Sequence, residues 1–292
     1  MSREAFLLLN NILLVISMAL VLLGTLYPLA YEVVTDGDKI SVGVPYFNAS
    51  FVPLMLALAA ALGIAPVLNW KRTPPAKLYA RLGWILLGAV AFGVAVPLLA
   101  SGALQWQVVL TLILAVWIVA AHLHDVYLRA RRGVARVPAA YWGMLIAHLG
   151  FAVTLLGVAL TSVLTTERDL RMQAGDVEQV DSLTFEFLGT APAAGPNYVA
   201  ERGTFTVSEG ADRYVMQPEK RRYQASGSVM TEAAIDAGFT RDVYVSLGEP
   251  LDDGAWAVRL QIKPFVRWIW LGALMMAFGG CLAVADSRYR RL

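Results

Sequence analysis

Residues 141–164 read YWGMLIAHLGFAVTLLGVALTSVL, a stretch without a single Asp, Glu, Lys or Arg. A helix of about 20 mostly apolar residues is long enough to cross a bilayer. From Thr165 onward the hydrophobic period changes to two, and apolar residues alternate with polar ones in the strings Leu183, Phe185, Phe187 and Val243, Val245, Leu247. Such alternation is typical of half-buried strands. The sequence therefore predicts a membrane helix that leads directly into a β-rich domain.

The rest of the chain extends the membrane part. Hydrophobic residues make up 58% of the sequence and charged residues only 16%, a balance too apolar for an ordinary soluble domain. Besides 141–164, the apolar runs are Ala5–Tyr31, Tyr46–Leu68, Leu78–Ala100, Val108–Leu128 and Trp268–Ala285. The first run is too long for a signal peptide, so we expect it to stay in the protein. The predicted fold class is a polytopic α-helical membrane protein with about six transmembrane helices and a small antiparallel β-rich periplasmic domain.

Basic residues indicate on which side of the membrane each loop lies. They flank alternate ends of the spans, at Arg3, Lys71, Arg72, Lys77, Arg81, Arg129, Arg131, Arg132, Arg136, Arg288, Arg290 and Arg291, whereas the opposite short loops hold only Lys39. Because cytoplasmic loops carry the excess of Lys and Arg, we expect both termini in the cytoplasm of a bacterium and a multi-pass location in its inner membrane. The expected division is 1–164 as a five-helix transmembrane region, 165–264 as a periplasmic β domain, and 265–292 as a final transmembrane helix with a basic cytoplasmic tail.

The expected periplasmic domain reads as a barrel or sandwich of five to seven strands. Turn signals separate the strands at Gly195-Pro196-Asn197, Glu209-Gly210 and Asp252-Asp253-Gly254. The run Lys220-Arg221-Arg222-Tyr223 has two interpretations. It is either a surface for propionates or an acidic partner, or a solvated strand edge.

His148 is the one ionisable residue clearly inside a predicted span, where such groups are costly and require a reason. It points away from a stripe of small residues on the same helix. Small residues of this kind let membrane helices approach closely, and the stripe comprises Gly143, Ala147, Gly150, Thr154, Gly157 and Thr161. Its own face carries bulky apolar side chains at Met144, Phe151 and Leu155. A neutral histidine in such a place suits axial ligation of haem iron, and it also suits a hydrogen bond to a neighbouring helix.

His122, His124 and Asp125 have the composition of a metal cluster but not its spacing. Positions i and i+2 lie about 200° apart on a helix and cannot hold one ion, so we interpret them as ordinary helix residues. His122 nevertheless lies at a depth similar to that of His148, because one predicted helix ends where the next begins, and an intrachain pair of axial ligands stays open. Asp125 and Arg129 are spaced as a surface ion pair.

Several classes of function find no support in the sequence. We predict no catalytic residues, because there is no Ser-His-Asp order, phosphate-binding loop or pair of catalytic carboxylates. Cys281 is the single cysteine, so no disulfide or thiolate cluster forms within the chain. The charge pattern gives no sign of nucleic-acid binding.

Short distinctive strings are distributed along the whole chain. They are Leu8-Leu9-Asn10-Asn11, Gly24-Thr25-Leu26-Tyr27-Pro28, Pro45-Tyr46-Phe47-Asn48, Tyr141-Trp142-Gly143-Met144 with Ala147-His148-Leu149-Gly150, Gly195-Pro196-Asn197-Tyr198, Met230-Thr231-Glu232-Ala233-Ala234-Ile235 and Lys263-Pro264-Phe265-Val266-Arg267-Trp268. Together they resemble the CcmF/NrfE family of cytochrome c-type biogenesis proteins. The resemblance implies a role as a haem lyase in bacterial cytochrome c maturation, in which haem passes from a periplasmic haem chaperone to the CxxCH thiols of apocytochrome c.

The resemblance also implies a structural haem b held between two transmembrane histidines. The string around His148 carries one axial ligand of its iron onto this residue, with Met144, Phe151 and Leu155 as the haem-packing face. It keeps His122 and His124 among the ordinary residues.

The match covers only the C-terminal half of the family pattern. The N-terminal half of family members holds the second axial ligand and a tryptophan-rich WWD segment with histidines for the incoming haem. We therefore expect a truncated gene product or one subunit of a split protein, inactive alone, whose partners are the N-terminal WWD-containing half, the haem chaperone, apocytochrome c-handling maturation proteins and membrane lipid. Two further hypotheses from the residues are a transporter or exporter subunit and a non-catalytic scaffold for maturation partners.

Overall fold

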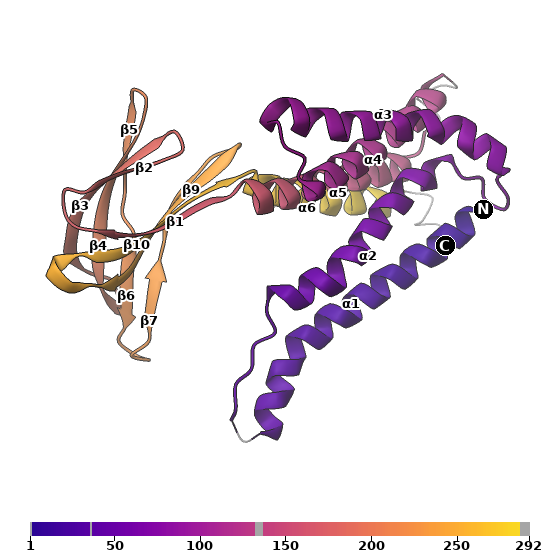
Figure 1. Ribbon diagram of the computed structural model, residues 1–292. Coiled ribbons are helices and arrows are strands. Elements are labelled where there is room, and N and C mark those ends of the chain that lie inside the picture. Colours follow the sequence, from indigo (N-terminus) through magenta and orange to yellow (C-terminus); the bar gives the residue numbers. More distant parts are fainter. Residues whose placement is uncertain (1, 36, 132–136, 287–292) are drawn as a thin grey trace. The chain divides into compact units, whose positions relative to one another are not determined.

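The computed structural model describes residues 2–35, 37–131 and 137–286 (Figure 1). Within these ranges, 6 helices are long and apolar enough to cross a membrane, as the sequence predicts. They are α1 (Arg3–Val34), α2 (Val44–Ile64, continued by the short η1 at Ala65–Val67), α3 (Pro75–Ser101), α4 (Trp106–Ala130), α5 (Ala139–Leu164) and α6 (Val266–Val284). Some of the basic residues used to predict topology lie outside the described ranges, namely Arg132, Arg136, Arg288, Arg290 and Arg291.

Helix ends fall where the sequence supplies a cap or a breaker. The hydroxyl of Ser2 accepts a hydrogen bond from the backbone N–H of Ala5 at 3.2 Å, which satisfies one of the free donors at the start of α1. Helix α3 is capped at its C-terminal end by Gly102, whose φ of 66° is left-handed and is adopted at low cost by glycine. The first turn of α2 contains Pro45, where a missing N–H does no harm.

Helix α4 is the most deeply buried of the described spans. Its side chains join those of α2, α3 and α5 in one apolar cluster that includes Ala59, Leu82, Ala89, Leu114, Ile118 and Ala152. The indole Nε1 of Trp117 donates a hydrogen bond to the backbone oxygen of Ala60 at 3.0 Å, and a Cβ on Gly63 would collide with the same ring. These contacts fix the rotation of α4 about its axis.

Helices α5 and α6 meet through glycines at backbone contact distance. A Cβ built on Gly143 would lie 2.4 Å from the backbone oxygen of Gly279, and one on Gly150 would lie 2.6 Å from that of Gly272. The stripe of small residues predicted from the sequence therefore forms the contact with α6, in the way that small residues let membrane helices approach closely.

The chain divides into two compact units, one formed by Met1–Leu156 with Leu271–Leu292 and the other by Gly157–Trp270. The second unit holds the strands, which are β1 (Thr166–Met172), β2 (Val177–Val180), β3 (Leu183–Ala194), β4 (Tyr198–Glu209), β5 (Asp212–Met216), β6 (Glu219–Tyr223), β7 (Val229–Glu232), β8 (Ala234–Ala237), β9 (Arg241–Pro250) and β10 (Trp256–Pro264). One antiparallel sheet has the order β1-β10-β9-β8. The other has the order β2-β3-β4-β6-β7, with β5 also paired to β4.

A single apolar core joins the two sheets. Phe187 on β3 and Phe205 on β4 stack with ring centroids 4.7 Å apart, and Val245 and Leu260 of the other sheet belong to the same buried cluster. The predicted turns are confirmed, since Gly210 and Asp253 have φ values of 57° and 61° at the connections after β4 and before β10. The predicted five to seven strands are too few, because the described residues form 10 strands.

Candidate functional site

His148 on α5 lies against His122 on α4. Nδ1 of His148 is 2.7 Å from Nε2 of His122, and the two rings are nearly perpendicular, at 85°, with centroids 4.9 Å apart. The His122 side chain is fully buried, and its Nδ1 lies 2.8 Å from the backbone oxygen of Ile118. A continuous chain of hydrogen bonds thus runs from the backbone of α4 to the ring of His148.

The second ring nitrogen of His148 has a different environment. Among the described residues Nε2 of His148 has no hydrogen-bond partner. It is also not fully buried, because in the described part of the chain the one fully buried side-chain nitrogen or oxygen without a partner is Nε1 of Trp268. The side chain as a whole is half-buried. His148 therefore has one nitrogen fixed by the protein and one that is accessible. Histidines that bind a metal show this division between their two nitrogens.

The apolar residues of the predicted haem-packing face lie on the same helix. Phe151 and Leu155 are partly buried and pack against the apolar cluster formed by α2, α3 and α4. Met144 is likewise half-buried. The surroundings of His148 on α5 are thus apolar side chains rather than charged ones.

His124 and Asp125 do not join the histidine pair. His124 is half-buried, whereas the carboxylate of Asp125 accepts hydrogen bonds from Nε of Arg129 at 2.8 Å and from the hydroxyl of Tyr141 at 2.7 Å. The predicted pair of Asp125 and Arg129 is confirmed, and Tyr141 extends it to α5. In the described part of the chain no group of His, Cys, Asp and Glu has the geometry of a metal cluster.

The geometry also decides between two interpretations of His122. Both of its ring nitrogens are hydrogen-bonded, and the 2.7 Å between its Nε2 and Nδ1 of His148 leaves no room for an ion, because a ligating imidazole nitrogen stands about 2 Å from a metal. An intrachain pair of axial ligands therefore does not fit. Nor is His122 an ordinary helix residue, since it contacts the candidate ligand directly. The similar depth of the two histidines was the sequence signal for this contact.

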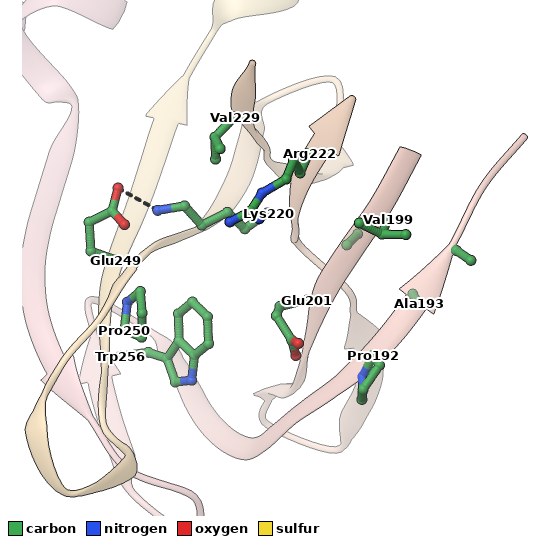
Figure 2. A pocket seen from close by; sticks show the side chains of 12 residues that line it. Pro192, Ala193, Val199, Glu201, Lys220, Arg222, Val229, Glu249, Pro250 and Trp256 are labelled. Carbon is green, nitrogen blue, oxygen red and sulfur yellow. Dashed lines mark ion pairs between the residues drawn. The ribbon is translucent and has the colours of Figure 1, made fainter. Parts of the chain in front are cut away.

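The strands form a second candidate site, an open groove of about 700 Å³. Figure 2 shows Trp256 and Glu201 beside this space and Lys220 paired with Glu249 across it. The lining combines apolar and charged side chains, namely Pro192, Val199, Val229, Pro250 and Trp256 with Glu201, Lys220, Arg222 and Glu249.

The basic run at Lys220-Arg221-Arg222 lies on β6, which pairs with β4 on one side and β7 on the other. Its interpretation as a strand edge is therefore wrong. Nζ of Lys220 is 2.5 Å from the carboxylate of Glu249, and Nε of Arg221 is 2.7 Å from that of Glu219. Two of the three cations are thus paired within the protein, and Arg222 is exposed at the groove.

Comparison with known proteins connects both parts of the chain to one family. The family described as the CcmF C-terminal beta-sandwich matches residues 163–264. The chain is 48% identical to the cytochrome c-type biogenesis protein CcmF of Pseudomonas fluorescens and 44% identical to that of Escherichia coli K12, over 99% of its own length in both comparisons. It is 29% identical to the biogenesis protein NrfE of Haemophilus influenzae.

The match extends to a solved structure. The protein titled Cytochrome c Heme Lyase CcmF superimposes with a TM-score of 0.77 over 98% of this chain, at 22% sequence identity, which shows a common fold. In every one of these comparisons the chain spans about half of the other protein, 44% and 45% of the two CcmF sequences and 46% of the solved chain.

Proposed function

We propose that this chain, which belongs to the CcmF/NrfE family of cytochrome c-type biogenesis proteins, is the C-terminal part of a membrane-bound haem lyase and that its His148 is an axial ligand of a b-type haem. The observation that carries the proposal is the division between the two nitrogens of His148. Nδ1 is hydrogen-bonded to His122, whereas Nε2 is accessible and has no partner in the described part of the chain.

The residues around His148 fit a haem. An imidazole nitrogen is a common axial ligand of haem iron, and bound haem supplies one-electron redox chemistry. Met144, Phe151 and Leu155 provide the apolar contacts that a porphyrin ring requires. Phe151 and Leu155 also pack against the apolar cluster around α4, which supports this face of α5. The contribution of the chain is then to bind the group and to exclude water from one side of it.

The second axial ligand is proposed to come from outside this chain. His122 has both nitrogens engaged, and His124, the remaining histidine of the 3, does not contact His148. The chain spans about half the length of its relatives, which leaves room for a ligand on an N-terminal part. The WWD segment and the reception of the substrate haem are proposed to belong to that N-terminal part. Contacts with a haem chaperone and apocytochrome c are proposed for that part and for residues 165–264.

The orientation follows from the charge distribution. With both termini in the cytoplasm, residues 165–264 face the periplasm, where cytochrome c receives its haem. The groove beside Trp256 and Arg222 then lies in the compartment of the proposed partners. A transporter subunit, the main alternative, finds no support in the names of these relatives, all of which are cytochrome c-type biogenesis proteins.

The test is the visible spectrum of the chain co-produced with an N-terminal part from a full-length relative. We expect a Soret band and the low-spin spectrum of an iron with two nitrogen ligands. His148→Ala should abolish both spectral features. His124→Ala is the matched control, because this histidine lies on α4 at a similar depth without contacting His148, and it should retain the haem. Full haem content in His148→Ala, or a colourless wild-type complex, would refute the proposal.

A further inference from the structure

We infer that His122 is a positioning residue for His148: it selects the tautomer of the His148 ring whose Nε2 carries a free lone pair, and it fixes the direction of that lone pair. The relevance of this to haem rests on the proposed function, but the tautomer itself is a property of the chain alone. The hydrogen-bonded arrangement lies between α4 and α5. It consists of one backbone carbonyl and two imidazole rings.

The location of each proton follows from what each atom is able to do. The backbone oxygen of Ile118 only accepts hydrogen bonds, so Nδ1 of His122, 2.8 Å away, must donate. A neutral imidazole has one donor and one acceptor, and His122 Nε2 is therefore the acceptor. Nδ1 of His148, 2.7 Å from it, must then donate. The remaining nitrogen of His148, Nε2, is left without a proton.

Neutral rings are the form that this location favours. Both histidines lie within helices long and apolar enough to cross a membrane, where a charged side chain is costly. A doubly protonated His122 would turn its Nε2 into a donor and force His148 into the opposite tautomer, with the proton on Nε2. The deduced arrangement is thus also the one that leaves a ligand nitrogen available.

The buried surroundings of His122 fix the direction in which the free lone pair of His148 points. His122 and Ile118 are both fully buried, and α4 is held by neighbouring helices on several sides. The ring of His148 is therefore hydrogen-bonded to a group that has no freedom to follow it. A metal-ligating histidine commonly donates its second N–H to a partner that orients the ring and fixes its tautomer. In this chain the partner is another histidine.

Two substitutions separate this role from simple packing. His122→Phe keeps an aromatic ring of similar size in the buried space but has no acceptor. His122→Gln places an amide oxygen near the position of Nε2 and is able to accept from His148 Nδ1. A residue needed only to fill space would tolerate Phe better than Gln, whereas a positioning residue requires the reverse order.

Nitrogen NMR of the full chain in detergent tests the tautomer directly, because labelling histidine yields signals from only 3 residues. We expect both His122 and His148 to carry their proton on Nδ1, with a bare Nε2 on His148, and the His148→Ala and His124→Ala spectra provide the assignment. In His122→Phe the His148 signals should move to the average of two exchanging tautomers, and in His122→Gln they should return. A proton on Nε2 of His148 in the wild-type chain would overturn the inference, as would unchanged His148 signals in His122→Phe.

A haem titration of the complex with the N-terminal part gives the second readout. Loss of such a partner commonly weakens metal binding about 10- to 100-fold, which is the effect expected for His122→Phe together with a shifted haem reduction potential, whereas His122→Gln and His124→Ala should stay within a few-fold of wild type. Equal affinity and potential in His122→Phe and wild type would refute the role of His122. If the wild-type complex binds no haem, the proposed function fails, and the NMR result still decides the tautomer.

Discussion

Two neighbouring glycines of α6 allow the contact between α5 and α6 to be tested with one chemical change. Gly279 is buried, and a Cβ there would lie 2.4 Å from the backbone oxygen of Gly143 and 2.6 Å from the backbone nitrogen of Ala147. Gly280 is exposed, and a Cβ there would meet nothing within 4 Å. We therefore expect Gly279→Ala to destabilise the protein and Gly280→Ala to leave it unchanged or slightly more stable.

The magnitude follows from the distances. Ordinary contacts begin at 3.4 Å, so Gly279→Ala requires the two backbones to separate locally by about 1 Å, and overpacking of this kind typically costs about 1–3 kcal/mol. Replacing glycine by alanine within a helix also gains up to about 1 kcal/mol. Because this gain occurs in both variants, it cancels when they are compared with each other, and the difference measures the contact between the helices.

Thermal unfolding in detergent, followed by tryptophan fluorescence and by gel filtration of heated samples, measures this difference. At about 2–4 °C per kcal/mol for a chain of this size, Gly279→Ala should melt roughly 2–12 °C below Gly280→Ala. Equal melting temperatures for the two variants would show that α5 and α6 are not in backbone contact at Gly143, and the packing described for the seam would be wrong.

Three further predictions concern topology and the strands. Alkaline phosphatase fused after Gly210 should be active and after Arg72 inactive, and the opposite result would invert the proposed orientation. Phe187→Ala removes a buried ring stacked on Phe205 and should lower the free energy of unfolding of the strands by about 3–5 kcal/mol, whereas Val215→Ala, at 59% exposed, should change it little; denaturant unfolding followed by circular dichroism compares the two. Burial and the neighbouring Asp236 raise the pKa of Tyr214 to about 12 from about 10 in an unfolded chain. Because the unfolded state loses its proton first, stability should fall between these pH values. Tyr214→Phe should show a smaller fall over the same range, and identical alkaline stability profiles of the two proteins would contradict the raised pKa of Tyr214.

The helices were predictable because their signal is long and redundant. Each span has some twenty residues of apolar composition, and the glycine seam is visible on α5 as a seven-residue spacing of Gly143, Gly150 and Gly157. Its partner was less obvious, although Gly272 and Gly279 repeat the same spacing on α6. What the sequence does not state is which helix pairs with which, because hydropathy is a property of one helix at a time.

The strand count was underestimated for a physical reason. Strands β2, β7 and β8 have 4 residues each, too few for an alternating pattern to stand out from a loop. In β7 every residue is exposed, so burial supplies no alternation at all. The long strands β3, β4, β9 and β10 carry most of the buried core, and the period-two strings from Leu183 and from Val243 lie in two of them, β3 and β9.

The contact between His122 and His148 shows a related limit. Counting residues from the helix ends gave their common depth, but a hydrogen bond also requires that both side chains point toward each other around their helix axes. That rotation is set by contacts with other helices, such as Trp117 against Gly63 on the α4 side. The resemblance to the family identified His148, and only the three-dimensional arrangement identified the residue that supports it.

Helix α5 meets a different requirement on each of its two sides. One side makes close backbone contact with α6, and the other places His148 within hydrogen-bond distance of His122 on α4. At 100° per residue, His148 lies about 160° around the helix from Gly150, so the seam toward α6 and the histidine toward α4 are on nearly opposite faces. In the glycine seam the two backbones are in direct contact, so the rotation of α5 and its depth beside α6 depend on that contact. The position of His148 Nδ1 relative to His122 depends on that same rotation and depth.

A change at Gly279 therefore acts on His148 without touching it. A local separation of about 1 Å at the seam is comparable with the tolerance of a 2.7 Å hydrogen bond, since such bonds weaken markedly beyond about 3.2 Å. We accordingly expect Gly279→Ala, and not Gly280→Ala, to shift the nitrogen signals of His148 in the same direction as His122→Phe. Unchanged His148 signals in a destabilised Gly279→Ala protein would show that the two faces of α5 act independently.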